Sequence, residues 1–214
     1  THGIADEDRI SMIHNPIVSP DLFEKQNEAI EHPWLIDSDI PVVIGVGRLH
    51  DQKDFETTIR AFNIVRRNRA ARLLILGEGA EKERLLAVTK ELGLEESVEI
   101  HGFVSNPHAY ISRASVLALT SRSEGFGNVL VEALAAGTPV VSTKCPGGPA
   151  EILEDGQFGK LVPVGDVESI AQAVLDTLDD PPDRDALIDR AKDFSIDTIT
   201  SRYMEIIDVN RSRT

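Results

Sequence analysis

The sequence predicts an α/β fold with six parallel strands and helices on both faces of the sheet. Three observations support this prediction. Segments typical of strands and of helices alternate six times, the strand segments are continuously apolar, and no two of them are joined by a hairpin signal. Continuous apolar runs are typical of strands buried on both faces, as in parallel sheets. The alternation therefore predicts a doubly wound, Rossmann-like sheet.

The regular alternation is expected to begin at residue 41. The first strand, residues 41–47, is an apolar run that ends in a glycine turn. The later strands are expected at residues 72–76, 98–101, 115–120, 139–142 and 159–162. The helices are expected at residues 55–69, 80–92 and 107–113, after the stretch 123–127, and at residues 167–178, 184–193 and 198–209.

The first 40 residues are expected to be less regular. An apolar run at residues 9–14 predicts a short strand that ends at the turn Asn15-Pro16. Residues 17–40 are polar and irregular, so we expect a long connection that Trp34 anchors on the core. Because the chain begins at Thr1 without a methionine, we expect it to be a piece of a longer protein.

Composition narrows the functional classes. With 41% hydrophobic and 27% charged residues the chain is an ordinary globular sequence, and its net charge of −14 argues against binding to nucleic acid or anionic membranes. The single cysteine, Cys145, permits no internal disulfide and fits a reducing cytoplasm; we expect it to be an inert, half-buried residue. No apolar run approaches the ~20 residues of a membrane span. A cytoplasmic location is therefore expected.

The stretch of residues 123–134 carries the main functional signal. Gly125 and Gly127 allow several backbone amides to point outward where a strand passes into a helix, and such a helix start attracts phosphate. Glu124 and Glu132 flank this seat, and carboxylates accept hydrogen bonds from hydroxyl groups. Together these groups suit a sugar-diphosphate-ribose ligand. In the alternative interpretation, Glu132 lies on the solvated face of an ordinary helix and Glu124 only balances its dipole.

Two basic residues, Arg48 and Lys53, follow the first strand and are expected at the same sheet edge. Together they can offset a diphosphate, although two solvated surface charges are the simpler alternative. Gly77-x-Gly79 lacks the third glycine of a dinucleotide fingerprint, so no nicotinamide cofactor is predicted. The six histidines show no metal-ligand spacing on one helix face, so no metal site is expected.

Taken together, these motifs resemble a known family. In order they are Gly47-Arg48-Leu49-x3-Lys53, the stretch from Glu124-Gly125-Phe126-Gly127 to Glu132, Ala136-Gly137-Thr138-Pro139-Val140-Val141, and Gly148-Pro149-Ala150-Glu151-Ile152-Leu153. The chain resembles the C-terminal domain of retaining family 4 (group 1) glycosyltransferases, which have two Rossmann-like domains in the GT-B fold. The resemblance covers about residues 10–209. The loop at residues 145–149 looks most like bacterial transferases that build polysaccharide, lipopolysaccharide or lipid-linked oligosaccharide.

The resemblance implies a role for each motif residue. Arg48 and Lys53 would bind the donor diphosphate and stabilise the departing nucleotide, while Glu124 would bind the donor sugar; these three are the expected catalytic residues. Glu132 would hold the ribose diol. The loop Gly125, Phe126, Gly127 and Asn128 would meet the phosphate, and the backbone of Gly102, Phe103 and Val104 would contact the base, which we expect to be uracil. The family needs no Asp-x-Asp metal motif, and Asp37-Ser38-Asp39, which precedes a strand, is interpreted as a turn. No cofactor is expected besides the donor.

The resemblance also implies a domain organisation. Residues 1–40 would be an interdomain strand and connecting loop, residues 41–193 the donor-binding domain, and residues 194–214 a crossover helix and tail. The expected partners are a nucleotide-sugar donor, the N-terminal Rossmann domain that this chain lacks, and a glycan or lipid-linked acceptor. The missing domain would bring the protein to the inner face of a membrane. A fragment of this kind is expected to catalyse little by itself. Two alternatives stay open: a non-catalytic nucleotide-sugar binding module, and a nucleotide-sugar epimerase on the same fold.

Overall fold

The computed structural model describes residues 12–36 and 39–211. Their centre is a six-stranded sheet in the order β3-β2-β1-β4-β5-β6, and every neighbouring pair is parallel. The strands are β1 Val42–Val46, β2 Arg72–Leu76, β3 Val98–Gly102, β4 Val116–Leu119, β5 Val140–Thr143 and β6 Lys160–Val162. The predicted α/β fold with six parallel strands is confirmed.

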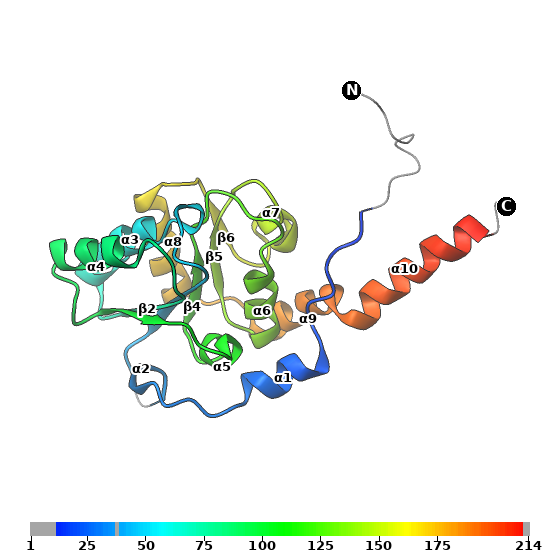
Figure 1. The fold of residues 1–214 in the computed structure, drawn as a ribbon, viewed down its shortest axis with the longest axis horizontal. Coiled ribbons are helices and arrows are strands. Elements are labelled where there is room, and N and C mark those ends of the chain that lie inside the picture. Colours follow the sequence, from blue (N-terminus) through cyan, green and yellow to red (C-terminus); the bar gives the residue numbers. More distant parts are fainter. Residues whose placement is uncertain (1–11, 37–38, 212–214) are drawn as a thin grey trace, which may run out of the picture.

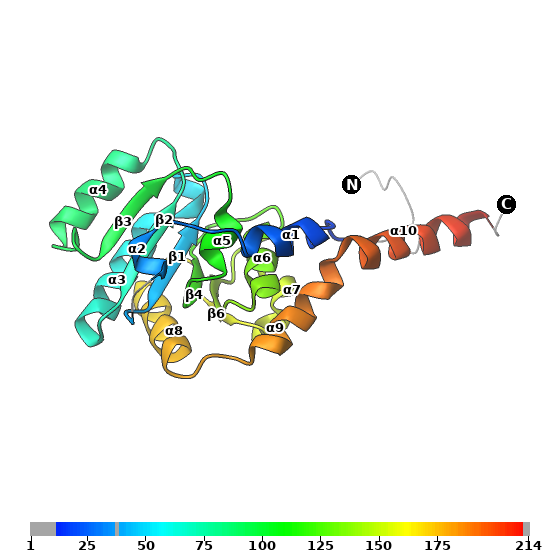
Figure 2. The same cartoon turned by 90° about the horizontal axis from the view of Figure 1, so that it is seen from below.

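Helices cover both faces of the sheet (Figures 1 and 2). One face carries α3 Phe55–Asn68, α4 Lys82–Glu91 and α8 Val167–Asp179, whose apolar residues form one core cluster with the sheet. The other carries α1 Pro20–Gln26, α5 Pro107–Ile111, α6 Asn128–Ala136, the short α7 Pro149–Ile152 and α9 Arg184–Ala191, which contribute to a second cluster. Each expected strand or helix in residues 41–211 lies within about two residues of its predicted ends.

The alternation of side chains along each strand explains the two clusters. In β1, Val42 and Ile44 pack into one cluster and Val43 into the other, and β2 alternates in the same way. On α3 the buried residues Ile59, Phe62 and Val65 recur at helical spacing and form the stripe that faces the sheet. Both faces of the central strands are therefore buried, as their continuous apolar runs predict.

The strand order places the candidate site. β1 lies between β2 and β4. From β1 the chain first adds β2 and β3 on one side, and then crosses to the other side of β1 to add β4, β5 and β6. In doubly wound sheets a ligand crevice forms at such a switch point, beyond the carboxyl ends of the strands. The loop after β1, which contains Lys53, therefore lies beside the loop after β4, which contains Glu124.

The prediction for residues 17–40 is wrong in part. This segment contains α1 and a further short helix, α2 Pro33–Ile36. Pro20 occupies the first turn of α1, where its fixed φ favours a helix, and Leu22 and Gln26, spaced by one turn, are buried. Trp34 does pack against the core, with the Arg72 guanidinium 5.0 Å from its ring centre.

The expected strand at residues 9–14 is not confirmed. Residues 12–14 are not in a strand, and residues 9–11 lie outside the described residues. Val18 instead makes a single parallel bridge with Ser195. A turn is also predicted at Asp37-Ser38-Asp39, and Asp37 and Ser38 lie outside the described residues.

The last helix, α10 Ile196–Arg211, extends away from the body of the molecule (Figures 1 and 2). Three of its large apolar residues, Tyr203, Met204 and Ile207, are about half exposed. No helix within the described ranges is both long and apolar enough to cross a membrane.

Candidate functional site

Two glycines let the loops after β1 and β2 pack closely. A Cβ on Gly77 would lie 1.8 Å from the carbonyl oxygen of Gly47, and one on Gly79 would lie 2.2 Å from that of Leu49. These distances exclude any side chain at either position. The Gly77-x-Gly79 motif is therefore explained by the close packing of the loop that carries Arg48 and Lys53.

Lys53 and Glu124 meet at the centre of the sheet edge. The Lys53 ammonium donates to Oε1 of Glu124 over 2.6 Å, and the hydroxyl of Ser121 donates to the same oxygen. The Glu124 side chain is only 8% exposed and that of Lys53 is 21% exposed. Across the described ranges, no hydrogen bond reaches the second oxygen, Oε2. Glu124 is thus held by one oxygen and keeps the other available as an acceptor.

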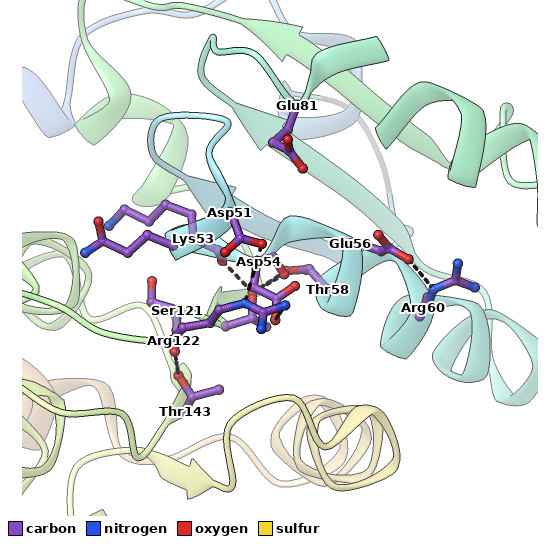
Figure 3. Close-up of polar contacts among 12 residues, drawn as sticks. Asp51, Lys53, Asp54, Glu56, Thr58, Arg60, Glu81, Ser121, Arg122 and Thr143 are labelled. Atoms are coloured by element: carbon purple, nitrogen blue, oxygen red, sulfur yellow. Dashed lines mark hydrogen bonds and ion pairs between the residues drawn. The ribbon is translucent and has the colours of Figure 1, made fainter. Parts of the chain in front are cut away.

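The end of β4 fixes the loop that carries Lys53. The hydroxyl of Thr120 lies 3.1 Å from the carbonyl oxygen of Lys53 and 3.0 Å from that of Asp54. The hydroxyl of Thr58 lies 2.7 Å from the Thr120 hydroxyl. Arg122 makes an ion pair of 3.2 Å with Asp54, and Figure 3 shows the cluster. Asp54 adopts a left-handed backbone with φ of 50°, which is strained for a residue other than glycine. These contacts stabilise that strained turn and with it the position of Lys53.

The helix start at α6 has the predicted glycine turn. Gly127 adopts φ of 97° directly before the helix, a conformation that favours glycine. The prediction for Gly125 is not supported by conformation, because its φ is not left-handed and a Cβ there would meet no atom within 4 Å. The Leu130 amide donates to the carbonyl of Gly127 over 2.9 Å, which leaves the amides of Asn128 and Val129 to bind an anion at this helix start.

The loop at residues 145–149 packs closely against the Glu124 loop. A Cβ on Gly147 would lie 2.0 Å from the carbonyl oxygen of Glu124, and one on Gly148 would lie 2.0 Å from that of Phe126. The amide of Glu124 also donates to the carbonyl of Pro146 over 3.0 Å. The glycines of this motif therefore act by close packing. Cys145 is 4% exposed, so it is buried and not half-buried as expected, and burial raises the pKa of its thiol.

Glu132 lies one turn into α6 and is mostly buried, with a side chain that is 20% exposed. Burial raises its pKa to about 6. It borders a cavity of about 490 Å³ that Asn128, His108 and Lys25 also line. His108 Nδ1 lies 3.6 Å from Glu132 Oε2, and the pKa of this histidine is lowered by burial and by Lys25. A carboxylate in such a recess lacks the full solvation of a surface residue, which weakens the alternative of a solvated helix face.

The remaining predicted residues surround a second cavity, of about 370 Å³. Arg48, Phe103 and Val104 line it together with Gly47 and Pro107, and Gly102 ends the adjacent strand β3. Phe103 is 73% exposed, which is unusual for so large an apolar side chain. Arg48 therefore faces the expected base-binding loop, whereas Lys53 is paired with Glu124. The sequence predicted both basic residues at one edge but not this division between them.

Sequence reasoning missed a cluster of His32, Glu99 and His101, whose potential ligand atoms all lie within 4.8 Å of one another. Glu99 is 2.7 Å from His101 and 3.3 Å from His32. The backbone amide of Trp34 donates to His32 Nδ1 over 3.3 Å, which puts the ring proton on Nε2, toward Glu99. This tautomer favours a hydrogen-bonded network over metal ligation. A search along helix faces could not find the cluster, because it joins a strand to a loop.

Comparison with known proteins identifies the family. Residues 26–194 match the family described as glycosyl transferases group 1. The chain belongs to this family. It is 41% identical over 150 residues to the N-acetylgalactosamine-N,N'-diacetylbacillosaminyl-diphospho-undecaprenol 4-alpha-N-acetylgalactosaminyltransferase of Campylobacter jejuni, a match that covers 70% of the chain and 40% of that protein. It is 33% identical over 175 residues to the lipopolysaccharide core biosynthesis glycosyltransferase LpsE of Rhizobium meliloti, covering 79% of the chain and 50% of LpsE.

A solved structure resembles the fold of this chain. Anabaena HepE in complex with UDP and glucose matches with a TM-score of 0.74 and 25% identity, covering 92% of this chain and 56% of HepE. The chain thus spans about half the length of the relatives that it matches, or less. The Rossmann-like fold of group 1 glycosyltransferases of the GT-B type is confirmed.

Proposed function

We propose that this chain is the donor-binding half of a glycosyltransferase that moves a sugar from a nucleotide sugar to a glycan, lipid-linked or polysaccharide acceptor. The observation that carries the proposal is the Lys53–Glu124 pair at the sheet switch point, with one carboxylate oxygen free to accept. Family membership supports it, as do the names of the two curated relatives, which mention a lipid-linked saccharide and lipopolysaccharide.

The donor would lie along the sheet edge, from the base cavity to Glu124. The base enters the cavity beside Phe103 and Val104, and the ribose diol donates to Glu132. The diphosphate lies between Arg48, Lys53 and the amides at the start of α6, while the sugar hydroxyls donate to Glu124 Oε2. HepE was solved with UDP and glucose, which supports a uridine nucleotide as the donor carrier.

The reaction depends on charge that grows on the departing diphosphate. Arg48, Lys53 and the start of α6 together stabilise that charge at the sheet edge. Because side chains supply this positive charge, we propose that transfer needs no metal ion. We also propose retention of the anomeric configuration, which is the outcome that the family resemblance implies. Glu124 orients the sugar so that its anomeric carbon meets the acceptor.

The acceptor site would belong to another domain. We propose that residues 1–40 and 194–214 connect the donor-binding domain at 41–193 to that partner domain, and that the exposed apolar residues of α10 pack against it. The whole protein would act in the cytoplasm, on an acceptor at the inner face of a membrane.

Isothermal titration calorimetry of this chain tests the proposal. UDP should bind in buffer that contains EDTA as tightly as in buffer that contains magnesium or manganese, and GDP should bind more weakly. Binding that needs the metal would contradict the metal-free mechanism. Failure to bind any of UDP, GDP and their sugars would contradict the donor-binding role itself.

A further inference from the structure

Two donors converge on one oxygen of Glu124. The Lys53 ammonium and the Ser121 hydroxyl both donate to Oε1, from loops that follow different strands. Ser121 has no exposed surface, whereas the Lys53 side chain remains 21% exposed. The contact from Ser121 is therefore fixed inside the protein, and the contact from Lys53 lies at its solvent-facing side.

The backbone of Ser121 is itself tied down. The hydroxyl of Thr143, at the end of β5, donates to the Ser121 carbonyl over 2.6 Å, a bond visible in Figure 3. Thr143 is also without exposed surface, and Ser121 directly follows Thr120, which is bound to the Lys53 loop. Ser121 is thus anchored at the ends of β4 and β5, and none of these contacts involves the side chain of Lys53.

A donor diphosphate would compete with Glu124 for Lys53. A diphosphate that enters the site carries more negative charge than one carboxylate, and an ammonium on a flexible stem can turn toward it. Glu124 would then lose one of its two hydrogen bonds. A buried carboxylate that is held by a single hydrogen bond keeps its orientation only if that bond comes from a rigid donor.

We propose that Ser121 is a positioning residue that holds Glu124 Oε1, and so directs Oε2 to the donor sugar, while Lys53 moves its contact from Glu124 to the diphosphate. The inference rests on the proposed function, because it assigns the diphosphate to Lys53 and the sugar to Glu124. It adds that Lys53 binds Glu124 only when the site is empty, whereas Ser121 binds Glu124 both in the empty site and in the site that holds the donor.

The binding test compares Ser121→Ala with the wild-type chain, using UDP and UDP-glucose as probes. The variant should bind UDP-glucose about tenfold more weakly, because a hydrogen bond to a charged group is lost, and UDP within about twofold of wild type. Ser97→Ala is the matched control, since Ser97 is also buried and donates to a backbone carbonyl, at the opposite edge of the sheet. Equal losses for both ligands, or no loss, would overturn the proposal.

A double-mutant cycle separates positioning from folding. In a Glu124→Ala background the further change Ser121→Ala should leave UDP-glucose affinity unchanged, because the hydroxyl has no carboxylate left to hold. A full additional loss in that background would assign the effect to a general disturbance of the β4 loop and would overturn the positioning role.

A readout without ligand keeps this inference distinguishable from the proposed function. In carbon-13 NMR the Glu124 carboxyl resonance should shift or broaden in Ser121→Ala and stay unchanged in Ser97→Ala. An unchanged resonance in Ser121→Ala would contradict the positioning role even if UDP-glucose binds. If wild type binds no nucleotide sugar, the proposed function fails and the inference, which rests on it, fails with it.

Discussion

Replacing Glu132 is predicted to stabilise the fold and to weaken donor binding. Burial raises its pKa from 4.5 to about 6, so the folded state binds a proton more tightly than the unfolded state does. The associated stabilisation is fully present below about pH 4.5 and is lost as the pH rises through about 6. At pH 7.5 the buried charge therefore costs the fold up to about 2 kcal/mol, because one pKa unit corresponds to about 1.36 kcal/mol.

The substitution Glu132→Gln removes this cost while it keeps the shape of the side chain. We expect the variant to be more stable than wild type by up to about 2 kcal/mol at pH 7.5, with a difference that shrinks toward zero at pH 4.5. Urea unfolding followed by circular dichroism at several pH values measures both numbers. Glu83→Gln, at an exposed position of α4, is the control for loss of a surface charge.

The result that would refute the reasoning is a Glu132→Gln variant that is no more stable than wild type at pH 7.5. A gain in stability that is the same at pH 4.5 and at pH 7.5 would be equally damaging, since a titration cannot produce it. A confirmed gain would identify Glu132 as a residue that costs stability, which is common at functional sites.

Three further predictions concern the same sheet edge. UDP affinity should fall as the pH drops through about 6, because protonated Glu132 can no longer accept from both ribose hydroxyls; a flat profile from pH 5 to 7.5 in calorimetry would contradict its role. Arg48→Ala and Lys53→Ala should each weaken UDP binding by at most about 1.5–3 kcal/mol, and by less for the exposed Arg48; unchanged affinity in both would make them plain surface charges. Thr120→Val, which removes the hydroxyl that holds the Lys53 loop, should lower the free energy of unfolding by about 1–3 kcal/mol and weaken UDP binding as well. A Thr120→Val variant with normal stability and normal UDP affinity would contradict the role of Thr120 in holding the Lys53 loop.

The fold could be predicted because its signals are local. Each strand is a short apolar run such as residues 72–76, and the helices between the strands follow from the spacing of apolar residues. The order and the type of the elements can therefore be predicted from local patterns in the sequence. The two helices within residues 17–40 were missed because they are short and depend on burial against the core. Their signals, such as Pro20 at a helix start, were outweighed by the polar composition of the segment.

The site could be predicted only as a set of motif residues. Arg48, Lys53 and Glu124 were expected at one edge, because loops after neighbouring parallel strands meet there. The pairing of Lys53 with Glu124, and the support from Ser121 and Thr143, could not be predicted, because these contacts depend on which strands are neighbours in space. The raised pKa of Glu132 could not be predicted from the sequence either, since it results from burial and not from residue type.

The most direct test of the proposed donor site compares two variants against two ligands. Dissociation constants of Glu124→Gln and Glu132→Gln are measured by calorimetry for UDP and for UDP-glucose. We expect Glu132→Gln to weaken both ligands alike, because both carry the ribose, and Glu124→Gln to weaken only UDP-glucose. A glutamine keeps the shape and one acceptor, so the comparison isolates charge from packing. Identical losses for both ligands in both variants would mean that the two glutamates only shape the loop and the helix, and would contradict the assignment of the sugar to Glu124.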